Sequence, residues 1–274
     1  MECFSSLLCR RMKIYLSGII SKQKRCNLCW DFSCEYWLVA FPELKGVKNI
    51  DEKIGFIKDR FLDSWWYSIR IRWLELSVVD YANFINKYPN YFNVIANMDT
   101  SSVEETISNQ KFLESETKQK ILPVYHRSDI KEWNIKLLEK YCEEYDYIAL
   151  WWVAWLWLSP RQKEYYLWKS FQIAMKHKTK IHWFGITSLN ALVRYPFYSV
   201  DSTSWLQQEK YNQFTIFNNG KWYKYTAREY REKYWLDPGK KPTYRKTWES
   251  KKQWEKFNDY ITKLHIAKWM EYWN

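Results

Sequence analysis

Short apolar runs alternate with amphipathic segments from Lys13 to about Trp205. The apolar runs predict strands at 13–16, 37–41, 61–63, 93–96, 121–125, 147–150, 180–184 and 197–200. Helices between them have readable starts. Ser77 with Asp80 resembles a capping box, Ser159 with Pro160 provides a cap and a first-turn proline, and Ser101 or Ser102 begins another. The chain therefore alternates strand and helix along most of its length.

This alternation predicts a parallel sheet, and eight strands within about 190 residues suit a compact α/β fold of the (β/α)8 TIM-barrel type. A doubly wound sheet is the alternative. We expect the barrel to occupy residues 12–208, followed by a short basic C-terminal extension, residues 209–274. In either fold ligands bind at the carboxyl ends of the strands.

Polar residues follow several of the predicted strands. Asp63 and Ser64 follow the third strand, Asp99 the fourth and His126 the fifth, while Asp201 lies within the eighth unit. A single aspartate at a strand end is more often a helix cap or an ion-pair partner. Three carboxylates converging on one mouth repel each other and raise some of their pKa values, which is the condition for dividing nucleophilic and acid/base roles.

Tryptophan is abundant where such a chain would carry glycine. There are 19 Trp and 6 Gly, whereas an average chain of this length holds about 19 Gly. We expect many of these tryptophans to stand for a codon, UGA, that another genetic code reads as glycine. The alternative is genuine indoles that fill a core or form a stacking platform. The strongest candidates for glycine are Trp65, Trp66, Trp151, Trp152, Trp155 and Trp183, whereas Trp205 has the context of a genuine tryptophan.

With glycine restored, three segments resemble, in order, the barrel motifs of the tRNA-guanine and DNA-guanine transglycosylases. They are Leu62-Asp63-Ser64-Gly-Gly-Tyr67, Ala149-Leu150-Gly-Gly-Val153-Ala154-Gly and His182-Gly-Phe184-Gly185-Ile186-Thr187. The resemblance spans roughly residues 13–205 and depends on recoding at five or more positions. It implies exchange of guanine for a 7-deazaguanine base in tRNA or DNA, through a covalent intermediate and without an organic cofactor.

The resemblance also implies residue roles. Asp201 is the expected nucleophile on the sugar C1′, and Asp63 is the acid/base that handles a proton of the heterocycle. Asp99 is expected to read the N–H edge of the base as a bidentate acceptor. His126 lies near the place of a base-contacting glutamine in the family, so it either contacts the base or packs. The remaining expected base-site positions are Ser64, Trp151, Trp152 and Trp183.

The cysteines depart from the family pattern. The tRNA enzymes hold zinc with three Cys and one His downstream of the nucleophile, and no Cys follows Cys142 here, so neither that zinc nor the dimer contact it supports is implied. Cys26, Cys29 and Cys34 could share a metal, but this signal is weak because a closed zinc site needs four ligands. We predict no metal. Six scattered cysteines indicate a reducing cytoplasm, and the longest apolar run, residues 148–158, is too short to cross a membrane.

The charge of the chain favours a polyanionic partner. The formal net charge is +12, and residues 209–274 hold 15 Lys and Arg against 8 Asp and Glu. Aromatic residues interleave with these cations, which suits phosphate contacts beside stacked bases, although a solvated helical face is an equal alternative. The expected nucleic-acid contacts are Arg70, Arg72, Lys221, Lys224, Arg228 and Arg231.

Two further functions remain open on this sequence. The first is a non-catalytic protein that binds single-stranded nucleic acid by stacking bases on genuine tryptophans. The second is a barrel enzyme for a small phosphorylated substrate. The absence of a Gly-rich phosphate loop late in the barrel argues mildly against this second function, and it has no need of a basic tail.

Overall fold

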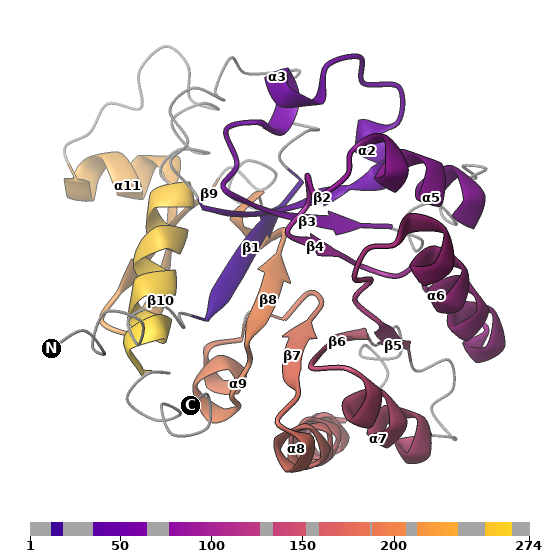
Figure 1. The fold of residues 1–274 in the computed structure, drawn as a ribbon. Coiled ribbons are helices and arrows are strands. Elements are labelled where there is room, and N and C mark those ends of the chain that lie inside the picture. The colour runs from indigo at the N-terminus through magenta and orange to yellow at the C-terminus, as the bar shows by residue number, and fades with distance from the viewer. Residues whose placement is uncertain are drawn as a thin grey trace, which may run out of the picture.

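The computed structural model describes residues 12–18, 35–64, 77–126, 134–151, 159–186, 188–206, 213–234 and 250–264. Eight parallel strands form one curled sheet (Figure 1). They are β1 (Lys13–Ser17), β2 (Tyr36–Ala40), β3 (Asp59–Asp63), β4 (Val94–Ile95), β5 (Val124–His126), β6 (Tyr147–Trp151), β7 (Lys180–Trp183) and β8 (Ser199–Ser202). All eight predicted strands are confirmed, although several of their ends differ.

The strand order, β4-β3-β2-β1-β8-β7-β6-β5, places the first strand beside the last, with Tyr15 opposite Asp201. A doubly wound sheet instead follows the order 3-2-1-4-5-6. The ladder is interrupted between β4 and β5, where one parallel bridge joins Ala96 to Leu122. The sheet is thus a curled half-barrel, compatible with a TIM-like barrel but without the continuous closed ladder that the sequence predicted.

The interruption has a local cause in helix α6 (Val103–Thr117). Only two residues of β4 extend beside β3, and the next backbone segment is held by α6 instead. Asn97 Nδ2 donates to the Thr106 carbonyl at 2.9 Å, and Asn109 Nδ2 donates to the Met98 carbonyl at 2.9 Å. The Asn97 N–H still donates to the Leu122 carbonyl, but the residues from Met98 to Thr100 are held by α6 rather than extending along β5.

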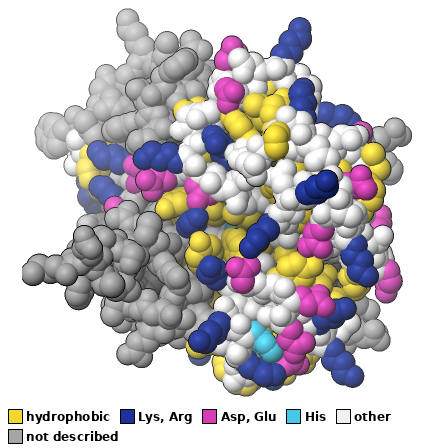
Figure 2. All heavy atoms as spheres, viewed as in Figure 1, with side chains coloured by type: hydrophobic (Ala, Val, Ile, Leu, Met, Phe, Trp, Pro, Cys, Tyr) yellow, Lys and Arg dark blue, Asp and Glu magenta, His cyan; other side chains and the backbone are white. Residues whose placement is uncertain are grey.

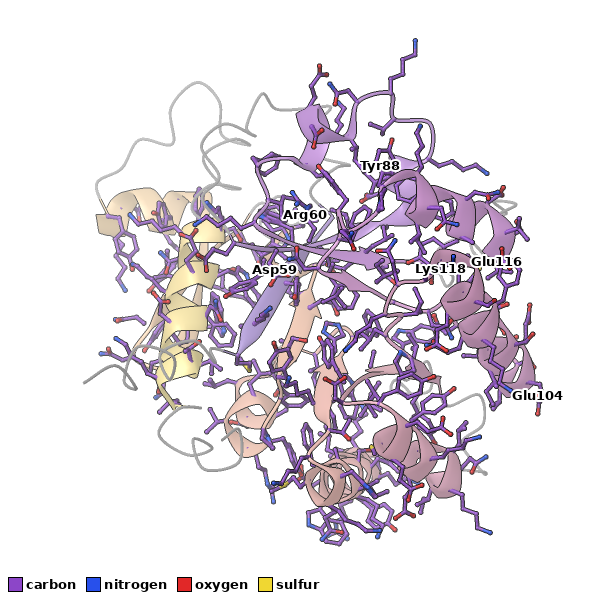
Figure 3. The ribbon with its side chains drawn as sticks, viewed as in Figure 1. Asp59, Arg60, Tyr88, Glu104, Glu116 and Lys118 are labelled. Carbon is purple, nitrogen blue, oxygen red and sulfur yellow. The ribbon has the colours of Figure 1, made fainter. Side chains whose placement is uncertain are left out.

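Helices follow the strands around the outside of the sheet (Figure 1). Besides α6 they are α2 (Phe41–Leu44), α3 (Ile50–Ile54), α5 (Val78–Lys87), α7 (Ile135–Glu144), α8 (Pro160–His177) and α9 (Leu189–Arg194). The predicted caps are confirmed: Ser77 forms a capping box with Asp80, Ser159 forms one with Gln162, and Ser102 caps α6. Glu104 marks the start of α6, and Glu116 and Lys118 mark its other end (Figure 3).

The two faces of the sheet have separate cores. Alternate residues along a strand point to opposite faces, and on the inner face Tyr15, Leu38, Phe61, Val124 and Ala149 form one buried cluster. The residues between them pack in a larger cluster with the helices, for example Leu62, Leu150 and Val200 with Leu113 and Phe171. This alternation decides which strand-end residues face the interior and which lie beneath the helices.

The C-terminal segment forms a small unit of its own. Strands β9 (Gln213–Asn218) and β10 (Lys221–Thr226) form an antiparallel hairpin, followed by α11 (Ala227–Tyr234) and a helix at 250–264. Phe214 stacks on Tyr230 with ring centroids 4.1 Å apart, and Phe217 packs against Phe257 on the last helix. Ser250 Oγ donates to the Trp205 carbonyl at 2.5 Å, which ties that helix to the end of the sheet.

Within the described ranges, no helix is both long and apolar enough to cross a membrane. The predicted domain boundary at residue 208 falls outside those ranges.

Candidate functional site

Asp201 lies in β8, near its carboxyl end, and is 8% exposed. Its Oδ1 accepts the backbone N–H of Gly185 at 2.6 Å, and its Oδ2 accepts the hydroxyl of Ser17 at 3.4 Å. Burial raises the pKa of Asp201 to about 6, although the Gly185 and Ser17 hydrogen bonds oppose this rise. The side chain is thus ionised at neutral pH in a nearly dry position.

Gly185 can donate this hydrogen bond because of its backbone conformation. Its φ is +70°, in the left-handed region that glycine adopts without strain, in the turn that follows β7. This turn aims the N–H of Gly185 across to β8. A β-branched or bulky residue here would strain the turn and misplace the donor.

Ser17 is held in place by Trp205. The indole Nε1 of Trp205 donates to the Ser17 carbonyl at 2.8 Å, and its ring meets that of Trp37 edge-on at 5.5 Å. Trp205 is 1% exposed. A buried indole whose N–H has a partner is what a genuine tryptophan requires, so these contacts support the expectation for this position.

Asp99 and Asp63 form a pair of carboxyl groups at the same end of the sheet as Asp201. Asp63 ends β3 and is half-buried, and Asp99 lies buried in the segment 97–100. Burial, and then the negative charge of Asp63, raise the pKa of Asp99 to about 8. Burial, and then the charges of Asp63 and Asp99, raise the pKa of Tyr81. The Tyr81 hydroxyl donates to the Ala96 carbonyl at 3.0 Å. Asp99 therefore carries a proton at neutral pH.

This raised pKa predicts a pH-dependent gain in stability for Asp99→Asn. Because the pKa of Asp99 is higher in the folded state than in the unfolded state, folding disfavours ionisation of this carboxyl. The free energy of unfolding is therefore highest below about pH 4, with respect to this group, and falls as the pH rises through about 8. At pH 9 the variant should be more stable than wild type by on the order of 2–5 kcal/mol. Urea unfolding at pH 4 and pH 9 measures the difference, which should nearly vanish at pH 4.

The matched control is Asp259→Asn, at an exposed position of the last helix. It should change stability little at either pH. A gain for Asp99→Asn that is equal at pH 4 and pH 9 would contradict the buried, protonated carboxyl.

The tryptophans at the strand ends point in different directions. Trp151 ends β6 on the inner face and packs, half-buried, against the inner cluster. Trp183 is 2% exposed in the outer cluster, where its ring meets Phe197 edge-on at 5.9 Å. The structure therefore does not bring Trp183 to the aspartates, because position 183 alternates with the inward-facing His182. Ser64 is fully buried, and its hydroxyl has no partner among the described residues.

Several predicted residues lie outside the described ranges, which also exclude the side chains of His126 and Arg231. His126 is placed only by its backbone, which pairs with Trp151. The others are Trp65, Trp66, Arg70, Arg72, Trp152, Trp155, Cys26, Cys29 and Cys34. Cys142 is buried with a free thiol, and burial raises the pKa of that thiol to about 12.

The predicted basic contacts lie on the C-terminal unit. Lys221 and Lys224 are exposed on β10 on either side of Tyr223, which is 42% exposed. Arg228 is exposed on α11 and pairs with Glu232 at 2.8 Å. On the face of the molecule in Figure 2, basic and acidic side chains are interspersed rather than gathered in a single stripe.

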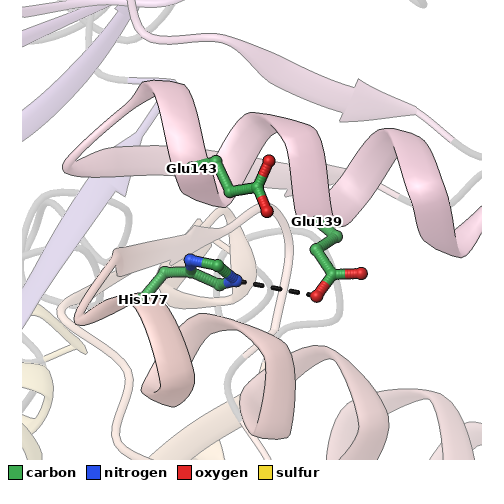
Figure 4. A group of neighbouring side chains, drawn as sticks. All are labelled: Glu139, Glu143 and His177. Atoms are coloured by element: carbon green, nitrogen blue, oxygen red, sulfur yellow. Dashed lines mark ion pairs between the residues drawn. The ribbon is translucent and has the colours of Figure 1, made fainter.

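Within the described part of the chain, one cluster has the composition of a metal site. Glu139 and Glu143 on α7 lie beside His177 at the end of α8, with ligand atoms within 4.8 Å of one another (Figure 4). Lys176 Nζ pairs with Glu139 Oε1 at 2.6 Å and lowers the pKa of that carboxyl. A cation would have to compete with this ammonium group at an exposed position, and the cluster lies away from the aspartates.

Sequence reasoning gave no role to His182, Ser199, Ser17 or Gly185. His182 is fully buried on the inner face of β7, and its Nδ1 lies 2.7 Å from the hydroxyl of Ser199. Burial lowers the pKa of His182 to about 3, so the ring is neutral. Strand periodicity gave a signal for His182, since it alternates with the apolar residues of β7 that face the helices.

No family model matches the chain, and a search of curated proteins finds no match.

Proposed function

We propose that the chain is a guanine transglycosylase that exchanges guanine for a 7-deazaguanine base in tRNA or DNA. The observation that carries this proposal is the buried, ionised carboxylate of Asp201, held by Gly185 at the same end of the sheet as the Asp63–Asp99 pair. Parallel α/β sheets bind their ligands at this end. The identity of the substrates, guanine and a 7-deazaguanine base, comes from the motif resemblance described above.

In the proposed reaction, Asp201 Oδ2 attacks C1′ of the target nucleotide. Its contact with Ser17 is long at 3.4 Å, whereas Oδ1 is held closely by Gly185. As the Oδ2–C1′ bond forms, the C1′–N9 bond breaks, and its electron pair passes to guanine, which takes a proton from a nearby carboxyl. The incoming base returns a proton to that carboxyl, its N9 attacks C1′, and Asp201 leaves as a carboxylate.

The pKa values support a division of roles between the carboxyl groups. At neutral pH Asp201 is ionised, as a nucleophile must be, while Asp99 is protonated. The N–H groups of a bound guanine favour the charged form of Asp99 and would release its proton into the site. In the proposed reaction Asp63, whose charge acts on Asp99, receives that proton and acts as the acid/base.

The proposal includes closure of the sheet between β4 and β5 as a (β/α)8 barrel. The bridge between Ala96 and Leu122 supports it, since the Leu122 N–H donates to the Ile95 carbonyl at 2.7 Å and the Asn97 N–H donates to the Leu122 carbonyl at 2.9 Å. The proposed chemistry is proton transfer and nucleophilic displacement at carbon, so it requires no organic cofactor.

The direct test is incorporation of a labelled base. The purified chain is incubated with tritiated guanine or a labelled 7-deazaguanine and with either tRNA or double-stranded DNA, and acid-precipitable label is counted. Label in one polymer identifies the acceptor. If neither polymer gains label when the chain carries glycine at the recoded positions, the proposed function is wrong.

We expect the cations of the hairpin and α11 to contribute to nucleic-acid affinity through phosphate contacts. Replacing Lys221, Lys224 and Arg228 by alanine should weaken binding and reduce the slope of log K against log salt by about 0.7–0.9 for each phosphate contact that is lost. Fluorescence anisotropy at several salt concentrations measures the slope. Alanine at Lys111, Lys136 and Lys140, exposed on α6 and α7, is the matched control. An equal change in both variants would mean that only net charge matters.

The second candidate function is non-catalytic binding of single-stranded nucleic acid. The observation that favours it is the exposed ring of Tyr223 on the same face of β10 as Lys221, an arrangement in which a base stacks while a phosphate meets a cation. Tyr223→Ala would then cost about 1–3 kcal/mol of binding to a single strand, and no base exchange would occur.

A further inference from the structure

A chain of polar groups crosses the inner face of the sheet and ends at Asp201. The hydroxyls of Tyr147 on β6 and Ser199 on β8 lie 2.6 Å apart, and the Ser199 hydroxyl lies 2.7 Å from His182 Nδ1 on β7. The other ring nitrogen, His182 Nε2, lies 3.9 Å from Asp201 Oδ1. This series of polar groups starts at a cavity of about 600 Å³, which Tyr147 lines together with Lys13, Asp59 and Lys180.

The ring of His182 is fixed by three aromatic neighbours. It is 0% exposed, and its centroid lies 4.6 Å from Phe61, 4.5 Å from Phe184 and 6.1 Å from Tyr15. The hydrogen bond to Ser199 fixes the rotation of the ring about the Cβ–Cγ bond. The direction in which Nε2 points is therefore determined by packing and not by solvent.

The position of the proton on His182 follows from the charge of Asp201. A neutral imidazole carries one N–H, and with Asp201 ionised a bare Nε2 would aim a lone pair at a carboxylate. The proton therefore lies on Nε2, and Nδ1 accepts from Ser199. Ser199 in turn accepts from Tyr147, whose pKa burial raises, so that this hydroxyl keeps its proton.

This arrangement leaves one buried donor unused. His182 Nε2 has no hydrogen-bond partner within the part of the chain that the structure describes, and an unsatisfied buried donor is costly and rare. Asp201 Oδ1, which already accepts from Gly185, is an acceptor 3.9 Å from this nitrogen. A small movement of the carboxylate would bring the two groups within hydrogen-bond distance.

We propose that His182 is a positioning residue for Asp201, whose Nε2–H donates to Oδ1 and steadies the carboxylate when it leaves C1′ with full negative charge. The inference rests on the proposed function for its catalytic meaning. The effect of the Nε2–H on the Asp201 carboxylate, 3.9 Å away, is a property of the folded chain and can be measured without catalysis. Tyr147 and Ser199 act through His182 by keeping its proton on Nε2.

The test compares three variants at one position. His182→Phe keeps an aromatic ring without nitrogen, His182→Gln keeps an N–H close to the Nε2 position, and His182→Asn keeps one close to the Nδ1 position only. Among the described residues, the titratable groups that face this position are Asp201, Tyr15 and, through Ser199, Tyr147. The pKa of Asp201 is followed by carbon NMR of protein labelled at the aspartate carboxyl carbon, with Asp201→Asn to assign the signal.

A donor to the charged form lowers a carboxyl pKa, so its loss raises that pKa. We expect the pKa of Asp201 to rise by about one unit in His182→Phe and His182→Asn, and to stay near the wild-type value of about 6 in His182→Gln. The exchange assay should show a fall in kcat of about tenfold with little change in KM for His182→Phe. Ser199→Ala, which removes only the proton-placing hydroxyl, should give a smaller shift of the same sign.

The outcomes separate the two proposals. An unchanged Asp201 pKa in folded His182→Phe overturns the positioning role, whatever the activity. If the His182 variants unfold, an unchanged pKa in Ser199→Ala overturns it instead. A raised pKa in a chain that shows no exchange, even with glycine at the recoded positions, leaves the contact established and overturns the transglycosylase proposal.

Discussion

Asp201→Asn is expected to abolish base exchange, with a loss of roughly 10⁴-fold or more, while the chain stays folded. An amide nitrogen is not a nucleophile toward C1′, so the covalent step is lost. The amide oxygen of asparagine can still accept the Gly185 N–H that Asp201 accepts at 2.6 Å. Because the wild-type carboxylate is charged and buried, the variant should be at least as stable at neutral pH.

The measurement pairs incorporation of labelled base with a denaturing gel. The chain with glycine at positions 65, 66, 151, 152 and 155 should form an adduct with nucleic acid that survives denaturation, and the same chain with Asp201→Asn should not. Asp259→Asn, at an exposed aspartate, should match the glycine-bearing parent chain in both assays. Full exchange by Asp201→Asn would assign the nucleophile to another residue.

Glycine in place of tryptophan at positions 65, 66, 151, 152 and 155 is expected to switch base exchange on. The chain with tryptophan at all five should show at least about 100-fold less exchange, since misplacing a substrate by about 1 Å already costs that much. Trp151 illustrates the cause, because its side chain lies on the inner face beside the cluster that contains Ala149. Trp183 is left unchanged in this variant, since its ring fills the outer core.

Tandem mass spectrometry of the native peptides spanning residues 61–72 and 147–161 decides which residue the organism inserts. Trp205→Gly is the matched control for the variant, because that indole is buried and donates to Ser17. It should destabilise the chain by about 3–5 kcal/mol and gain no activity. Tryptophan in the native peptides, or strong exchange by the chain that carries all five tryptophans, would contradict the recoding hypothesis.

Much of the site was accessible from strand ends alone. The alternation in the sequence predicts Asp63, Asp99 and Asp201 just after or at strand ends; the structure has Asp63 at the end of β3, Asp201 near the end of β8, and Asp99 four residues beyond β4. Trp183 shows where this reasoning fails, since being next to a strand end does not say which face a side chain takes. One residue of displacement moves a side chain from the mouth to the layer beneath the helices.

The sequence by itself determined the succession of strands and helices along the chain. It also determined the capping residues Ser77, Ser102 and Ser159 and the position of Asp201 at a strand end. These features depend on residues close together in the chain, whose periodicity and hydrogen bonding are local. Only the tertiary structure decided that Gly185 and His182 face Asp201, that Asp63 raises the pKa of Asp99, and that the ladder is interrupted between β4 and β5. Hydrogen bonds, burial and electrostatic coupling between strands depend on register and distance, which arise only when the sheet is assembled.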